Sequence, residues 1–157
     1  MAIASKVQDY MSRNGVHYDV VAHPHSHNSS ETAELARVPG DRLAKSVVLE
    51  HEDGFVIAVL PSTCHVKLAR LGKEINHRML RLATEDDVEK LFDDCERGAV
   101  PAVGPAYGLA TYVDDALAGK PEIYFEAGDH EQLIRMTGND FMSMMSRAGH
   151  ARFASRY

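Results

Sequence analysis

The chain has 157 residues and a formal net charge of −6; 45% of its residues are hydrophobic and 25% are charged. This length predicts a single domain, residues 1–157, with a core large enough to need no disulfide or metal ion. No apolar run approaches the roughly 18 residues that span a bilayer, and the acidic balance argues against non-specific binding to duplex nucleic acid.

The two cysteines, Cys64 and Cys95, have neither a Cys-x-x-Cys spacing nor a metal-ligand spacing. Residues 1–11 are a mixed polar stretch without the apolar centre of a secretory signal peptide. Both observations favour reduced thiols in a cytoplasmic protein.

The first third of the chain predicts two helices and one strand. A helical repeat of apolar residues predicts an amphipathic helix over residues 3–14, which the following Gly15 would end. Residues 17–22 are typical of a short strand and residues 23–28 of a loop. A second helix is predicted over residues 29–37, capped by one of its first two serines.

The middle of the chain predicts a β-hairpin. Residues 45–50 and 55–60 are strongly apolar and flank the turn residues 52–54. The second arm is continuously apolar, so we expect a central strand that is buried on both faces. Residues 61–63 would break this strand and cap a third helix that runs to about Ile75.

The second half of the chain predicts short alternating elements. We expect a strand at 79–83, a helix capped by Thr84, strands at 109–113, 122–125 and 130–136, a helix from Gly138, and a loose tail at 147–157. Together the elements predict an α+β fold, with one mixed, largely antiparallel sheet of six to seven strands surrounded by helices.

A glycine–proline loop follows the fourth predicted helix: Gly98-Ala99-Val100-Pro101-Ala102-Val103-Gly104-Pro105. None of its side chains ionises, so the loop can present backbone N–H and carbonyl groups to a ligand, but it has no acid, base or nucleophile. Glycine allows close approach to a ligand and proline stiffens the chain, and such loops can present N–H groups to an oxyanion or a phosphate. Taken alone, the stretch is more typical of a plain turn.

Two side chains stand out beside this loop. Lys45 opens an apolar strand on the same face as Val47 and Leu49, so its ammonium group needs a partner, a ligand or a route to water. His130 opens another apolar strand after Gly128. For each residue, a structural role at a strand end is the alternative to a functional one.

His23, His25 and His27 alternate in the sequence, so an extended chain would place all three on one side. This pattern could hold a metal ion, but Pro24 and the lack of nearby acids or cysteines weaken it. The sequence contains no nucleophile-elbow motif, no Walker loop and no dinucleotide fingerprint.

A basic run interrupts the acidic chain. It places one acid, Glu74, among five cations: Lys67, Arg70, Lys73, Arg78 and Arg81. Such a patch can bind a polyanion at one place, and it can equally be the solvated face of a helix.

Three features occur in one order: a lysine that opens an apolar hairpin, a GAVPxxG loop after a helix, and Gly-x-His before a strand that ends in Leu-Ile-Arg-Met. This order resembles the YbaK/prolyl-tRNA-editing family, stand-alone relatives of the insertion domain of bacterial prolyl-tRNA synthetase. The resemblance covers residues 29–145. It implies a compact α+β domain around a mixed, barrel-like sheet.

The resemblance also implies site residues. Lys45, Gly98 and Gly104 would be catalytic. The substrate would be bound by Ala99, Val100, Pro101, Ala102, Val103, Gly128 and His130, and the tRNA by the five cations of the basic run. Many members have proline and a bulky apolar residue where this chain has Ala102 and Val103, which leaves the amino-acid preference open.

The implied activity is hydrolysis of the ester in mischarged tRNA, with a small amino acid such as alanine or cysteine on tRNA for proline. An aminoacyl ester is already activated, so positioned water and a stabilised oxyanion suffice, without a cofactor or metal. The expected partners are the acceptor end of tRNA and a synthetase, with no DNA or membrane. A non-catalytic module that binds tRNA or a synthetase and a histidine-loop metal protein are the alternatives.

Overall fold

The computed structural model describes residues 3–157. Its strands are β1 (Asp19–Ala22), β2 (Ala44–His51), β3 (Gly54–Pro61), β4 (Cys64–Val66), β5 (Arg81–Leu82), β6 (Ala110–Asp114), β7 (Glu122–Glu126), β8 (Gln132–Thr137), β9 (Gly149–Ala151) and β10 (Ala154–Arg156). Its α-helices are α1 (Ser5–Asn14), α2 (Ser29–Ala36), α3 (Leu68–Ile75), α4 (Glu85–Leu91) and α5 (Gly138–Met144), and its 3-10 turns are η1 (Gly40–Arg42), η2 (Gly104–Tyr107) and η3 (Asp115–Leu117).

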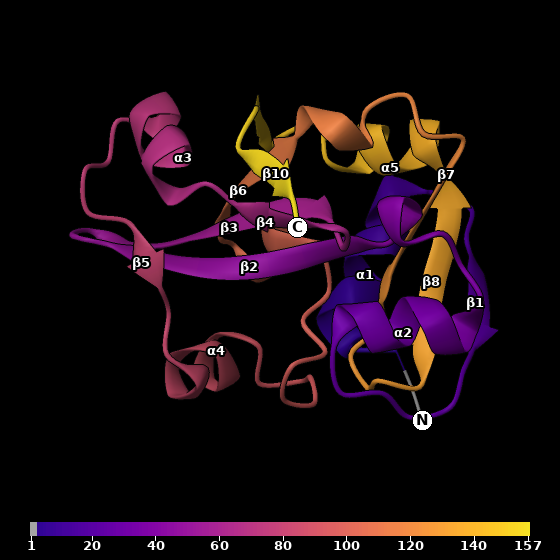
Figure 1. Cartoon of the computed structure of the whole chain (residues 1–157). Helices are drawn as coiled ribbons and strands as arrows, with labels where there is room; N and C mark the ends of the chain where they lie inside the picture. Colours follow the sequence, from indigo (N-terminus) through magenta and orange to yellow (C-terminus); the bar gives the residue numbers. More distant parts are fainter. Residues whose placement is uncertain (1–2) are drawn as a thin grey trace.

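The strands of the described residues divide into three sheets (Figure 1). The largest has the order β5–β2–β3–β6–β9, and the others have the orders β1–β8–β7 and β10–β4. A parallel bridge between Leu43 and Tyr124 links the first two. The α+β class and the mixture of parallel and antiparallel pairs are as predicted. A single barrel-like sheet of six to seven strands is not found, because β1, β7 and β8 pair among themselves.

The predicted hairpin is confirmed. β2 and β3 pair antiparallel from Ala44 opposite Pro61 to His51 opposite Gly54. β3 is the centre of its sheet, and all residues from Val56 to Pro61 are buried. The continuous apolar run therefore reflects burial on both faces, as expected for a strand with neighbours on each side.

The two faces of the five-stranded sheet pack against different segments. Val48 and Ile57 share one core with Phe92 and Val103, residues of the chain around the glycine–proline loop. Leu49, from the opposite face, packs with Leu71 of α3 in a second core. Figure 1 shows α3 and α4 on opposite sides of this sheet. Side chains that alternate along β2 thus point toward different segments.

Two predicted helix starts are corrected. The cap of α2 is Asn28, whose side chain accepts a hydrogen bond from the Glu31 N–H, and not one of the two serines. The third helix begins at Leu68 rather than directly after residues 61–63. Residues 64–66 form β4 instead, because β10 supplies a strand with which they pair.

The prediction of a loose tail is wrong, since residues 149–151 and 154–156 form β9 and β10. Asp114, which is only 4% exposed, explains why the tail is ordered. Its carboxylate accepts hydrogen bonds from the N–H groups of Phe153 (2.8 Å), Ala154 (2.9 Å) and Ala116 (2.8 Å). A buried carboxylate with three donors fixes the tail in a way that no local pattern reveals.

Asp114→Ala should lower the free energy of unfolding by about 3–5 kcal/mol, because three N–H groups, one of them in the buried residue Phe153, lose a charged acceptor. Urea unfolding measures this loss. The control is Asp115→Ala, which removes an exposed carboxylate whose ion pair is with Arg152 at 3.4 Å and should cost less than about 1 kcal/mol. Equal effects of the two variants would show that Asp114 does not hold the tail.

Candidate functional site

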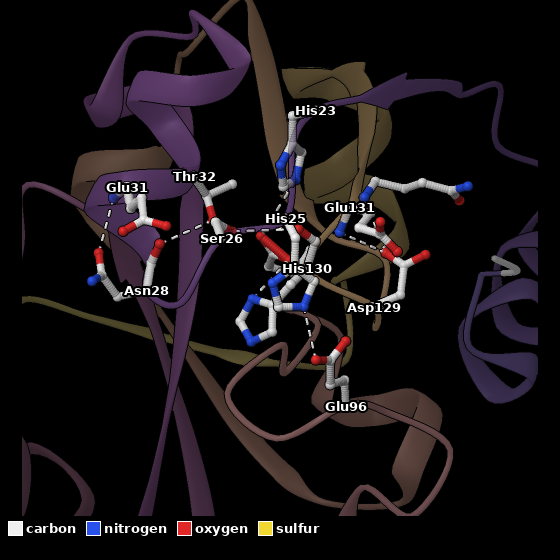
Figure 2. Close-up of polar contacts among 12 residues, drawn as sticks. His23, His25, Ser26, Asn28, Glu31, Thr32, Glu96, Asp129, His130 and Glu131 are labelled. Carbon is white, nitrogen blue, oxygen red and sulfur yellow. Dashed lines mark hydrogen bonds and ion pairs between the residues drawn. The ribbon is translucent and has the colours of Figure 1, made fainter.

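Three loops converge at one end of the sheets: residues 23–28 after β1, residues 92–103 after α4, and the turn 127–131 between β7 and β8. The N–H of Ser26 donates to the carbonyl of His130 at 3.1 Å, and the N–H of Glu96 donates to the carbonyl of Gly128 at 2.7 Å. Figure 2 shows side chains of all three loops gathered around His130. Backbone hydrogen bonds therefore hold the loops together.

His130 lies in the turn rather than at the start of β8 as predicted. Its φ is 60°, a left-handed conformation that is uncommon for residues other than glycine. The Asp129 carboxylate supports this turn by accepting hydrogen bonds from the N–H groups of Glu131 and Gln132, each at 3.0 Å. The His130 ring is 3% exposed, and its Nε2 donates to the carbonyl of Arg97 at 2.7 Å. Such strained, fully supported residues cluster at functional sites.

Gly98 lies directly against His130. Its φ is 82°, and a Cβ at this position would lie 3.1 Å from His130 Nε2. Gly128 also has a positive φ, 122°, and packs against Ala4 and Cys95. The structure thus brings together three of the predicted residues, Gly98, Gly128 and His130, and it requires glycine at two of them.

Most of the glycine–proline loop is buried. Pro101 and Gly104 are buried, and the residues that are 0% exposed are Ala99, Ala102 and Val103. A Cβ at Gly104 would overlap the Thr111 hydroxyl, so this glycine serves close packing. Gly98 and Val100 remain accessible, and within residues 3–157 their N–H groups have no acceptor. Backbone donors are therefore available at the start of the loop only.

The ammonium group of Lys45 does not contact the loop. Lys45 Nζ donates to the hydroxyl of Tyr157 at 3.0 Å and lies 5.0 Å from the centre of that ring. Its neighbour Ser46 makes the contact instead, with Oγ donating to the Pro101 carbonyl at 2.9 Å. Strand alternation explains the difference, because Lys45 shares the face of Val47 and Ser46 the face of Val48.

The five residues of the basic run are all exposed. Arg70 and Lys73 line a surface depression with Glu74 and Arg152. Arg81 is paired with Glu50 at 2.7 Å. Arg70 and Lys73 lie on α3, and Lys67 directly precedes it, whereas Arg81 lies in β5, which Figure 1 shows between α3 and α4.

Sequence reasoning missed a buried polar cluster behind His130. Glu126 Oε1 lies 4.0 Å from His23 Nε2, and Glu126 Oε2 lies 3.9 Å from His130 Nδ1. Within residues 3–157, none of these four atoms has a hydrogen-bond partner, and neither has Asp129 Oδ2. The only signal in the sequence was Glu126 itself, an acid at the end of the apolar stretch Ile-Tyr-Phe-Glu. An acid at that position is also common at the exposed end of an ordinary strand, so the sequence did not single it out.

Burial raises the pKa of Glu126 to about 7, and the negative charges of Asp129 and Glu96 act in the same direction. At the rim of the site, His25 Nε2 donates to Glu96 Oε1 at 2.8 Å, and this hydrogen bond raises the pKa of His25. The His25 ring lies edge-on to His130, 5.5 Å between centres. The site therefore contains a carboxyl group that titrates near neutral pH.

The histidine metal site, which the sequence left only as a weak alternative, does not assemble, because His23 is buried beside Glu126 while His25 and His27 are exposed. Among the described residues, the ligand atoms that all lie within 4.8 Å of one another belong to His51, Glu52, Asp53 and His77, at the far end of β2 from Lys45. Burial raises the pKa of the Cys95 thiol to about 12, so this cysteine is not a ready nucleophile.

Glu126→Gln should stabilise the protein at alkaline pH. The folded-state pKa of about 7 lies above the ordinary value of 4.5, so the wild-type protein loses stability as the pH rises from about 4.5 through 7, whereas glutamine stays neutral. The gain over wild type should grow to about 2–3 kcal/mol at pH 8. Urea unfolding at pH 5 and pH 8 measures it.

Glu131→Gln is the matched control, since Glu131 is a half-exposed neighbour in the same turn. It should change the free energy of unfolding by less than about 0.5 kcal/mol at either pH. If Glu126→Gln gave no larger gain at pH 8 than at pH 5, folding would not raise the pKa of the Glu126 carboxyl group.

Residues 23–144 match the model of the family described as the aminoacyl-tRNA editing domain. Among solved structures, the chain is similar to a crystal structure of a proposed trans-editing enzyme for prolyl tRNA synthetase, with 26% identity, a TM-score of 0.82, and coverage of 97% of this chain and 96% of that one. A hypothetical protein with 19% identity shares the fold at a TM-score of 0.83, with coverage of 96% and 100%.

No curated protein matches the sequence. Within residues 3–157, the helices lack the length and hydropathy of a membrane-spanning segment.

Proposed function

The chain belongs to the aminoacyl-tRNA editing domain family, and we propose that it is a trans-editing deacylase that hydrolyses the ester of mischarged tRNA. The match of residues 23–144 to the family model confirms the resemblance that the sequence showed. The matched range includes the three loops of the candidate site. The observation that carries the proposal is the contact of Gly98 with His130 inside this matched region. As the amino acid we propose a small one, such as alanine or cysteine. As the tRNA we propose that for proline, because the structural relative is described as a trans-editing enzyme for prolyl tRNA synthetase.

The chemistry fits a site built from backbone. Hydrolysis of an ester needs attack by water on the carbonyl carbon and donors for the oxyanion that develops. We assign the oxyanion to the accessible N–H groups of Gly98 and Val100, which have no acceptor within residues 3–157. The ribose hydroxyl beside the ester can help to activate the water. His130 would line the amino-acid end of the pocket.

The remaining predicted residues would bind the nucleic acid. Lys45 is half-buried and its ammonium group rests on Tyr157, so it can turn to a phosphate near the ester. The exposed cations Lys67, Arg70 and Lys73 lie on or beside α3, where they would contact the acceptor stem. The acidic remainder of the chain would keep this binding weak, which favours turnover.

Gly98→Ala should reduce deacylation by about 100-fold, because the added Cβ displaces His130 and disturbs the first N–H groups of the loop. A panel of mischarged tRNAs, with release of the amino acid as the readout, measures this. The control is Gly119→Ala, whose φ of 80° matches that of Gly98 but whose added Cβ meets no atom within 4 Å. Equal losses in both variants would assign the effect to backbone strain alone.

Lys45→Ala should raise KM for charged tRNA by about 10-fold with little change in kcat, since one phosphate contact is lost. The control is Lys90→Ala, an exposed lysine on α4. If Lys45→Ala had the kcat and KM of the wild type, Lys45 would not contribute to substrate binding. Binding of tRNA by the wild-type protein without hydrolysis of any ester would favour a non-catalytic module instead.

A further inference from the structure

The buried cluster behind His130 consists of hydrogen-bond acceptors. The ring of His23 donates from Nδ1 to the Pro24 carbonyl at 2.7 Å, so in the neutral ring Nε2 carries a lone pair. The ring of His130 donates from Nε2 to Arg97, so its Nδ1 carries the lone pair. Both lone pairs face the carboxylate of Glu126, at 4.0 and 3.9 Å.

Buried acceptors that face one another without a donor are unfavourable, because each has lost its bonds to water. The side chains are nine-tenths buried or nearly so: His23 is 0% exposed, His130 3% and Glu126 11%. Within residues 3–157, none of these acceptor atoms has a hydrogen-bond partner within 3.5 Å. The Thr32 hydroxyl is near enough to Glu126 to lower the pKa of that carboxyl group, but burial outweighs this effect. The cluster is therefore complementary to a ligand that carries several N–H donors and a positive charge.

We propose that Glu126, together with His23 and His130, binds the α-ammonium group of the aminoacyl ester. This inference rests on the proposed function, since it names the group of the substrate that the buried cluster recognises. An ammonium group has three N–H donors, and it can lie beside two acceptors that are 4 Å apart with a hydrogen bond of ordinary length to each. The carboxylate supplies the compensating charge.

The position of the cluster agrees with this role. Three exposed residues contact His130: His25, Arg97 and Gly98. Because Gly98 begins the glycine–proline loop and Arg97 directly precedes it, a ligand that reaches the cluster enters beside the N–H groups assigned to the oxyanion. In an α-amino ester, the ammonium group is attached to the carbon next to the carbonyl. One ligand can therefore place its carbonyl oxygen at Gly98 and its ammonium group at Glu126.

The test compares two esters that differ in the proposed group: alanyl-tRNA and lactyl-tRNA, in which a hydroxyl replaces the ammonium group. Each is given to the wild-type protein and to Glu126→Gln, and kcat/KM is measured for all four combinations. The preference is the ratio of kcat/KM for alanyl-tRNA to kcat/KM for lactyl-tRNA. The intrinsic difference in reactivity between the two esters cancels when the preference of the variant is divided by that of the wild type. We expect Glu126→Gln to reduce the preference for alanyl-tRNA by about 30-fold or more.

Two measurements separate recognition from damage to the fold. Glu131→Gln should keep the wild-type preference, because its side chain lies outside the cluster. Glu126→Gln should lose the preference while it gains stability at pH 8, which a merely structural carboxylate would not do.

The outcomes are distinct. If Glu126→Gln kept the wild-type preference while the wild type hydrolysed alanyl-tRNA, the inference would be overturned and the deacylase function would stand. If the wild type hydrolysed no ester of the panel, both would fall. If a chelator abolished the preference, the cluster would bind a metal cation and the inference would again be wrong.

Discussion

The hydrogen bond from His130 Nε2 to the Arg97 carbonyl is the interaction on which the site depends. It joins the β7–β8 turn to the glycine–proline loop, and it fixes which nitrogen of His130 carries the proton. It holds the His130 ring against Gly98, where a Cβ would lie 3.1 Å from Nε2, and it adds to the support that the Asp129 carboxylate gives the left-handed turn. The same bond turns the free lone pair of the ring toward Glu126. This one hydrogen bond thus determines both how His130 contacts Gly98 and which ring nitrogen faces Glu126.

The sequence predicted the parts of the fold that local patterns determine. The apolar run over residues 55–60 identified the central strand, and Thr84 identified the cap of α4, where its hydroxyl accepts from the Asp87 N–H at 3.1 Å. The tail could not be predicted in this way. Its strands depend on the Asp114 carboxylate and on partners far away in the sequence, and an alternating pattern of three residues is too short to show them.

The candidate site shows the same division. The family order of motifs predicted that Gly98, Gly128 and His130 belong together, and they lie together in the structure. Lys45 was assigned to the same pocket, but its side chain rests on Tyr157. Strand alternation correctly placed Lys45 on the face of Val47, but the sequence did not show that the loop packs on the opposite face, where Ser46 contacts Pro101. Glu126 was missed because its unusual property, burial without a partner, exists only after three loops have met.

The late pairing of β9 and β10 has a consequence for synthesis of the protein. β4 and the free edge of β6 are made long before the residues that complete their sheets. Until residues 149–156 leave the ribosome, both strands have unpaired backbone groups that can pair with another nascent chain. Misassembly during translation is thus a risk that this topology creates for high-level expression.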